Sequence, residues 1–196
     1  MFYPFLILVS GLLGAQTTGA GVGSSVVWND IKVTLVDARR LSLDEYREAR
    51  KPEPAPWAGG GFRFAFVVEN RPGAPLPPAL GEVRVMIDSK PYNAVTNATS
   101  RKPFAPLIII RDVRGFLATE YGAALKARIS APRPATTVSV LEIFIPGTAI
   151  PAGTSGEVDL ELGETYQLVA GRLRELSPQE TAKTWTYFPF TFPPLE

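Results

Sequence analysis

The chain has 196 residues, 45% of them hydrophobic, with a formal net charge of +1. This is enough for one ordinary domain with a hydrophobic core, and it does not fit a disordered chain. The small net charge gives no overall field that would attract nucleic acid or an acidic membrane. Cysteine and histidine are absent, which excludes disulfides, thiolate nucleophiles, iron–sulfur clusters, imidazole bases and histidine-held metals.

The composition also bears on the source. Proline is frequent, at 19 residues, whereas Asn and Gln are scarce. This bias is typical of heat-adapted proteins, so a thermophile is one expectation. A GC-rich genome would also favour Arg, Ala, Pro and Gly, and the sequence leaves both origins open.

Residues 1–20 are predicted to be a secretory signal peptide. The segment Phe2–Gly14 is almost wholly apolar but too short for an ordinary membrane span, which needs about 20 residues. Small residues at Ala15 and at Thr18–Ala20 offer cleavage positions. No basic residue precedes the apolar run, and the first is Lys32. The alternative is therefore an apolar N-terminal arm that adds a strand to a neighbouring subunit.

The next part of the chain predicts two strands separated by a short helix. Apolar and polar residues alternate over Val26–Asp37, which predicts the first strand. Ser42 and Glu45 fit the capping box of a helix over 43–50. The segment Gly61–Asn70 predicts the central strand, because a period of two places three aromatic side chains on one face: Phe62, Phe64 and Phe66.

Alternating or continuous apolar runs predict further strands at 82–88, 92–95, 107–110, 136–145, 156–162, 165–170 and 184–192. Pro189 cannot donate a ladder hydrogen bond, so the last strand is expected at a sheet edge or broken there. Leu117, Tyr121 and Leu125 stand four residues apart, which predicts one helix over 116–128 lying on the sheet.

About eight short strands with turn signals between them indicate an all-β fold. We expect an antiparallel immunoglobulin-like β-sandwich with one or two short helical insertions, formed as a single domain by residues 21–196.

Short motifs along the chain resemble those of one family. They are Val33-Thr34-Leu35-Val36, a strand ending in Val67-Val68-Glu69-Asn70, a polar turn ending in Tyr92, and Ile150–Val158 before an alternating strand. Over roughly 26–162 the chain looks like the telokin-like, immunoglobulin-like domains of unknown function in exported bacterial proteins. The insertions at 38–60 and 113–135 depart from the compact family pattern. The resemblance implies an immunoglobulin-like fold and an exported setting, and it carries over no catalytic residue.

Acidic residues provide two candidate sites. Glu157, Asp159 and Glu161 share one strand face and could bind calcium. Same-face neighbours on a strand lie about 6.5–7 Å apart, which is loose for one ion, so the alternative is the solvated face of an amphipathic strand. Glu142 lies between apolar residues and could be a buried carboxylate with a raised pKa. Its alternatives are a solvent-facing side chain and a buried one paired with Arg.

Three other features have both a functional and a structural interpretation. Trp57, Trp185 and Tyr187, with the phenylalanines, could form an aromatic platform for sugars or peptides, or belong to the core. Pro72–Pro78 could present a polyproline surface or form a stiff loop. Asn97–Thr99 matches the N-glycosylation pattern.

No residue is assigned to catalysis, a cofactor or a metal. The predicted function is a non-catalytic binding or scaffolding module, extracellular or periplasmic, with a protein partner or self-association. We expect no nucleic acid as partner, and membrane contact only through an uncleaved N-terminal segment. The alternative is a self-assembling structural subunit of an extracellular filament or coat, joined by strand addition. An enzyme would need a cleft with converging carboxylates, which the sequence does not indicate.

Overall fold

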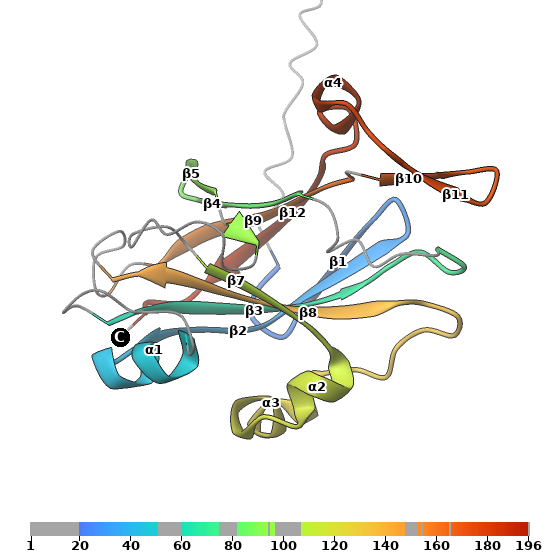
Figure 1. Cartoon of the computed structure of the whole chain (residues 1–196). Coiled ribbons are helices and arrows are strands. Elements are labelled where there is room, and N and C mark those ends of the chain that lie inside the picture. The colour runs from blue at the N-terminus through green and yellow to red at the C-terminus, as the bar shows by residue number, and fades with distance from the viewer. Residues whose placement is uncertain are drawn as a thin grey trace, which may run out of the picture.

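The computed structural model describes residues 20–50, 60–74, 82–93, 95–96, 107–147, 153, 155–164 and 166–195. These residues form mostly antiparallel β-sheets with a few short helices (Figure 1), which confirms the fold class at that level. The predictions made for the N-terminal segment 1–19, Trp57, Pro75–Pro78 and Asn97–Thr99 lie outside the described residues.

The larger sheet has the strand order β1-β2-β3-β8-β7-β6. Its strands are β1 (Ser25–Trp28), β2 (Ile31–Leu41), β3 (Gly61–Glu69), β6 (Val95–Thr96), β7 (Leu107–Asp112) and β8 (Val138–Pro146). All neighbours are antiparallel except β6 and β7, which are parallel. The aromatic-rich β3 lies between β2 and β8, so the predicted central strand is an interior strand of this sheet.

The second sheet has the order β12-β9-β4-β5, and β10 and β11 pair only with each other. The strands are β4 (Glu82–Ile87), β5 (Lys90–Asn93), β9 (Gly156–Gly163), β10 (Tyr166–Val169), β11 (Arg172–Glu175) and β12 (Thr186–Phe192). The helices are α1 (Leu43–Arg50), α2 (Val113–Leu117), α3 (Glu120–Ala124) and α4 (Pro178–Thr181), with a 3-10 turn at Lys126–Arg128. The helix predicted over 43–50 is thus confirmed, and Ser42 and Glu45 form the expected capping box.

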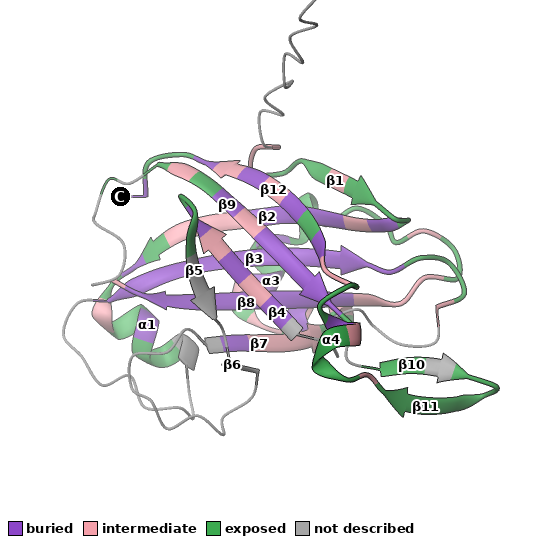
Figure 2. Cartoon of the chain, turned by 90° about the horizontal axis from the view of Figure 1, so that it is seen from above, coloured by how far each residue is buried: buried purple, intermediate pink, exposed green. Residues whose placement is uncertain are grey.

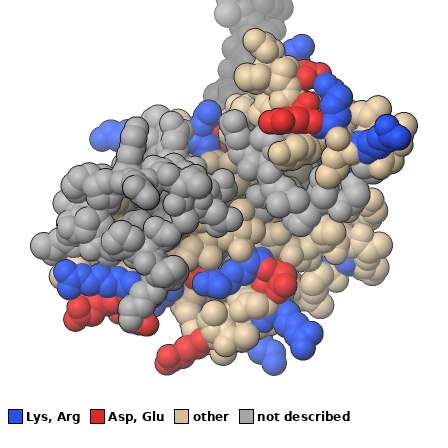
Figure 3. Space-filling view, in the orientation of Figure 1, with Lys and Arg blue, Asp and Glu red and all other residues tan. Residues whose placement is uncertain are grey.

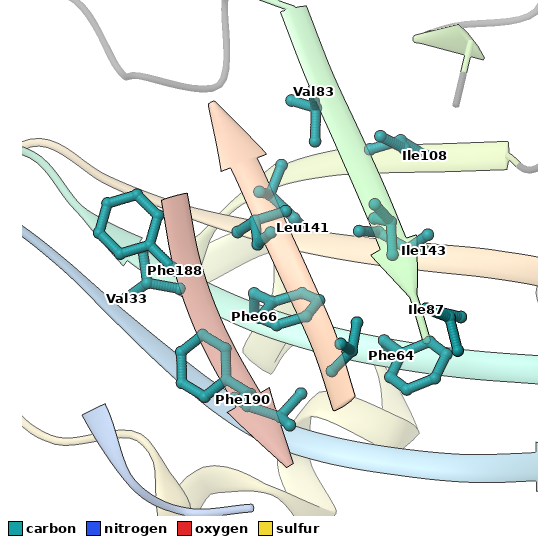
Figure 4. Packing of buried hydrophobic residues seen from close by; sticks show 14 of the residues in the cluster. Val33, Phe64, Phe66, Val83, Ile87, Ile108, Leu141, Ile143, Phe188 and Phe190 are labelled. Atoms are coloured by element: carbon teal, nitrogen blue, oxygen red, sulfur yellow. The ribbon is translucent and has the colours of Figure 1, made fainter. Parts of the chain in front are cut away.

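Side chains from both larger sheets form one hydrophobic core. Seen from above, β12, β9 and β4 cross over β2, β3 and β8 (Figure 2). Between them the Phe66 ring faces the Phe190 ring (Figure 4), with 5.6 Å between the ring centroids. The Phe64 ring meets the Phe192 ring edge-on at 5.4 Å. Each buried phenylalanine contributes about 1.5–3 kcal/mol, so the period-two aromatic face of β3 is a main source of stability.

Helices cover the other face of the larger sheet (Figure 1). In one cluster on this face, Phe116 and Leu125 pack on Val67 and Val140. In a second cluster, Tyr46 of α1 packs on Phe144. In β2, Leu35 pairs with Phe66 in the inter-sheet core, and the register then shifts so that Asp37 pairs with Ala65. The shift skips Val36, so Val36 and Asp37 both lie on the helix-covered side.

The predicted single strand over Val26–Asp37 is wrong, because a hairpin interrupts it. Asn29 and Asp30 adopt positive φ values of 50° and 62°, and Trp28 pairs with Ile31. A two-residue loop with both residues left-handed is the turn that matches strand twist, and Asn and Asp tolerate that conformation better than most residues. The alternating pattern continues on both sides of the turn, so periodicity alone does not reveal it.

The predicted continuous helix over 116–128 is also wrong. Thr119 ends α2 and caps α3, because its hydroxyl accepts a hydrogen bond from the Gly122 N–H at 2.9 Å. A Cβ at Gly122 would collide with the carbonyl of Phe116, so glycine allows the two short helices to pack closely. Tyr121 and Leu125 nevertheless face the sheet as their spacing predicts.

The last strand lies at an edge, as Pro189 predicts. β12 pairs with β9 on one side, and on its other side Ala20 forms one parallel bridge with Phe190. The Thr191 N–H donates to the Ala20 carbonyl at 3.0 Å. Backbone groups alternate in direction along a strand, so the nitrogen of Pro189 points to the same outer side as the N–H of Thr191. Because proline has no N–H, the outer edge of β12 lacks a hydrogen-bond donor at Pro189.

Glu69, at the end of β3, is a buried carboxylate held by two basic residues. Lys32 Nζ lies 2.9 Å from Oε1, and the backbone N–H and Nε of Arg133 donate to Oε2. Burial alone would raise the pKa of Glu69, but the hydrogen bonds and charges of Lys32 and Arg133 outweigh burial and lower that pKa.

The variant Glu69→Gln is expected to lose part of the acid sensitivity of the fold. A carboxyl whose pKa is lowered by folding stabilises the protein above its unfolded pKa, and this contribution is lost as pH falls through the folded pKa. Urea unfolding measured from about pH 5 to pH 2 should therefore give a shallower fall in the variant than in the wild type. Glu175→Gln, on the exposed strand β11, is the control and should follow the wild-type curve. Equal acid slopes for wild type and Glu69→Gln would contradict the assignment.

Candidate functional site

Glu142 is buried and paired with arginine, one of the two structural alternatives for this residue. It lies on β8, on the helix-covered face of the larger sheet. Arg111 Nε of β7 donates to Oε2 at 3.0 Å, and Arg63 Nη1 of β3 lies 3.8 Å from Oε1. Arg63 is itself buried, with 5% of its side chain exposed. The carboxylate thus balances the charge of a buried guanidinium.

These residues belong to a larger group of charged side chains with one tyrosine, which we call the arginine cluster. It comprises Arg39, Arg63, Arg111, Arg128, Asp37, Glu45, Glu142 and Tyr121. In the register of β2 and β3, Arg39 lies directly opposite Arg63, and Asp37 lies opposite Ala65, which faces Glu142 on β8. The basic pair Arg39 and Arg63 therefore lies next to the acidic residues Asp37 and Glu142 on the same face of β2, β3 and β8.

Tyr121 of α3 covers the buried guanidinium. The Arg63 Cζ lies 3.1 Å from the centroid of the Tyr121 ring, and Arg39 Cζ lies 5.3 Å from the same centroid. The Tyr121 hydroxyl donates to Asp37 at 2.8 Å, and Arg128 Nη1 contacts the other oxygen of Asp37 at 3.2 Å. Burial raises the pKa of Tyr121, so its phenol stays protonated between α3 and the sheet. Burial also lowers the pKa of Arg63.

The three acidic residues of β9 lie on the outer face of the smaller sheet, as their alternation predicts. Arg84 of β4 reaches Glu161 at 3.3 Å and stacks on Trp185 at 4.5 Å from the ring. Within the described part of the chain, no three His, Cys, Asp or Glu side chains gather closely enough to hold a metal ion. Burial raises the pKa of both Asp159 and Glu161, and Glu157 raises that of Asp159 further.

The variant Asp159→Asn is therefore expected to be more stable than the wild type near neutral pH. Folding raises the pKa of this carboxyl, so its ionised form is disfavoured in the fold at pH values above that pKa. The variant should melt at a higher temperature at about pH 7, and the difference should vanish at about pH 3, where the wild-type carboxyl is protonated. A lower melting temperature for the variant at neutral pH would show that the ionised group stabilises the fold instead.

The aromatic residues are used in two different ways. The phenylalanines of β3 belong to the core, so they provide no binding platform. Trp185 is half-buried against Arg84, whereas Tyr187 is exposed. On the β1–β2 hairpin Val27 and Trp28 are exposed as well.

A second strand after 165–170 was not predicted from the sequence. β10 and β11 form a ribbon that projects from the rest of the molecule beside α4 (Figure 1). They are joined by a two-residue turn at Ala170 and Gly171, whose φ values are 47° and 77°. Gly171 was the available signal for the turn. The strand that follows it, Arg172–Glu175, is exposed throughout and has only one apolar residue, so no hydrophobic alternation reveals the strand.

The ribbon is amphipathic in its exposed positions. Cross-strand partners share a face, so Tyr166, Glu175 and Leu173 lie on one face, while Gln167, Arg174, Val169 and Arg172 lie on the other. The second face is tied to α4, because Arg174 donates to Gln167 and Glu180. These bonds from Arg174, followed by the cap bonds from Ser177, lower the pKa of Glu180 to about 2. The first face carries exposed apolar side chains.

Charged side chains of both signs lie beside one another on the face shown in Figure 3. Comparison with known proteins gives no assignment: no family model, curated protein or solved structure matches the chain. Among the described residues, no helix has the length and apolar character needed to cross a membrane.

Proposed function

We propose that the protein is a non-catalytic binding or scaffolding module of the cell surface or periplasm, built on an immunoglobulin-like β-sandwich. The shared core of the two larger sheets supports the sandwich. The apolar run Phe2–Gly14 and the resemblance of short sequence motifs to telokin-like domains support an exported setting.

The observation that carries the binding role is the exposed apolar face of the β10–β11 ribbon. A two-stranded hairpin is marginally stable in water by itself, and its apolar side chains gain most when another surface covers them. Tyr166 and Leu173 lie outside the core, and Glu175 lies beside them. The partner that fits is a protein surface with an apolar strip flanked by Lys or Arg.

The two faces of the ribbon provide a matched test. Leu173→Ser changes the apolar face, whereas Val169→Ser changes the face that is tied to α4; the two side chains are 56% and 48% exposed. Cross-linking in envelope preparations from the source would identify the partner, which is then purified and mixed with the wild type and each variant. We expect the wild type and Val169→Ser to form a complex with the partner, and Leu173→Ser to lose it. Binding unaffected by Leu173→Ser would remove the ribbon from the proposal.

Self-assembly by strand addition is the second candidate, and one observation favours it. Ala20, where the described chain begins, pairs with the edge strand β12, so the outer edge of β12 accepts a backbone partner. The missing donor of Pro189 argues against a longer ladder there. Intact mass and particle size of the protein from its source separate the two functions. A monomer that lacks the first 15 or 20 residues supports the exported module, and a large regular assembly that retains them supports the structural subunit.

A further inference from the structure

Two arginines of the arginine cluster have unused hydrogen-bonding capacity. The Nε atoms of Arg39 and Arg63 are buried, and neither has a hydrogen-bond partner among the described residues. Arg63 reaches Glu142 at 3.8 Å, and Arg39 reaches Asp37 at 3.8 Å and Glu45 at 3.5 Å. These are ion pairs beyond ordinary hydrogen-bond distance. Buried donors in native proteins are normally satisfied, so this pair calls for an acceptor.

The position of the two arginines adds a second argument. They are direct cross-strand partners on β2 and β3, an arrangement in which like charges repel. Burial lowers the pKa of Arg63, and the nearby charge of Arg39 lowers it further. An anion that contacted both groups would remove this repulsion.

Charge and geometry indicate the class of anion. The cluster contains four arginines and the acidic residues Asp37, Glu45 and Glu142, which leaves one positive charge in excess. A carboxylate carries one negative charge, and its planar pair of oxygens matches the planar fork of a guanidinium. The Arg39 side chain is 42% exposed, so solvent reaches this residue, whereas its cross-strand partner Arg63 is buried beside it.

We propose that Arg39 and Arg63 form a binding site for a carboxylate group on the outer face of the larger sheet, between α1 and α3. The carboxylate accepts from both guanidinium groups, and Tyr121 holds Arg63 in place by stacking on it. The group belongs either to a free small acid or to an acidic side chain of a partner protein. This site is separate from the β10–β11 ribbon and does not depend on the function proposed for it.

The test follows the arginine Nε–Hε signals by nitrogen-15 NMR on the full chain. One arm titrates acetate and then succinate, and the other titrates a tetra-glutamate peptide, both at constant ionic strength against chloride. We expect saturable shifts of the Arg39 and Arg63 signals. Saturation by acetate or succinate identifies a free acid as the source, and saturation by the peptide alone identifies an acidic protein segment.

Variants connect the shifts to this site. Arg39→Gln should weaken binding about tenfold or more, as expected for the loss of a charged hydrogen bond. Arg39→Lys keeps the charge but not the fork and should restore only part of the affinity. Arg172→Gln, on the ribbon, is the control and should bind as the wild type does. Shifts that never saturate, or that persist unchanged in Arg39→Gln, would overturn the site.

Discussion

Replacing Phe66 with alanine is expected to lower the free energy of unfolding by about 3–5 kcal/mol. The ring is fully buried between the two larger sheets and packs against Phe190. Its removal would leave a cavity that two hydrogen-bonded sheets cannot close by shifting. Urea unfolding followed by tryptophan fluorescence would measure the change.

Tyr187→Ala provides the control for this prediction. Tyr187 is also aromatic and lies in β12, the strand that contains Phe190, but Tyr187 is exposed. The control should change the free energy of unfolding by no more than about 0.5 kcal/mol. A loss below about 1 kcal/mol for Phe66→Ala would mean that the two sheets do not share a tightly packed core.

The core was predictable because its signal is local. In β3 the alternation of Phe62, Phe64 and Phe66 is fixed by the geometry of a strand, and any partner sheet must cover that face. The same period did not reveal the turn at Asn29 and Asp30, since alternation resumes after a two-residue hairpin. The four-residue spacing around Tyr121 also survives the break at Thr119, because both short helices pack on the same sheet.

The candidate site was not predictable, because its contacts depend on register. Glu142 meets Arg63 and Arg111 only because β8 lies between β3 and β7, and the sequence does not state that order. Arg39 and Arg63 face each other through the pairing of β2 with β3, which the shift between Leu35 and Asp37 alters by one residue. Long-range pairing of charges therefore requires the structure, whereas the apolar face of a strand does not.

The variant Glu142→Ala tests whether the buried pairing holds this face of the sheet. Removing the carboxylate leaves Arg63 buried without its closest acidic partner, and breaking a buried pair from one side costs about 3–5 kcal/mol. Chemical unfolding of the variant would measure this loss. Glu164→Ala is the matched control, because Glu164 also meets an arginine, Arg71, at 3.0 Å but is 47% exposed against 6% for Glu142. The control should lose about 1 kcal/mol or less.

A double variant separates the charge from the shape of the site. In Glu142→Leu with Arg63→Met both buried charges are gone, and apolar side chains of similar size replace them. Because no charge is then left without a partner, stability should return to within about 1–2 kcal/mol of the wild type or exceed it. If the double variant were as unstable as Glu142→Ala, packing around Glu142 rather than charge pairing would explain the loss. If Glu142→Ala cost no more than Glu164→Ala, Arg63 would be satisfied by another group, and the carboxylate site at Arg39 would be the first place to look for it.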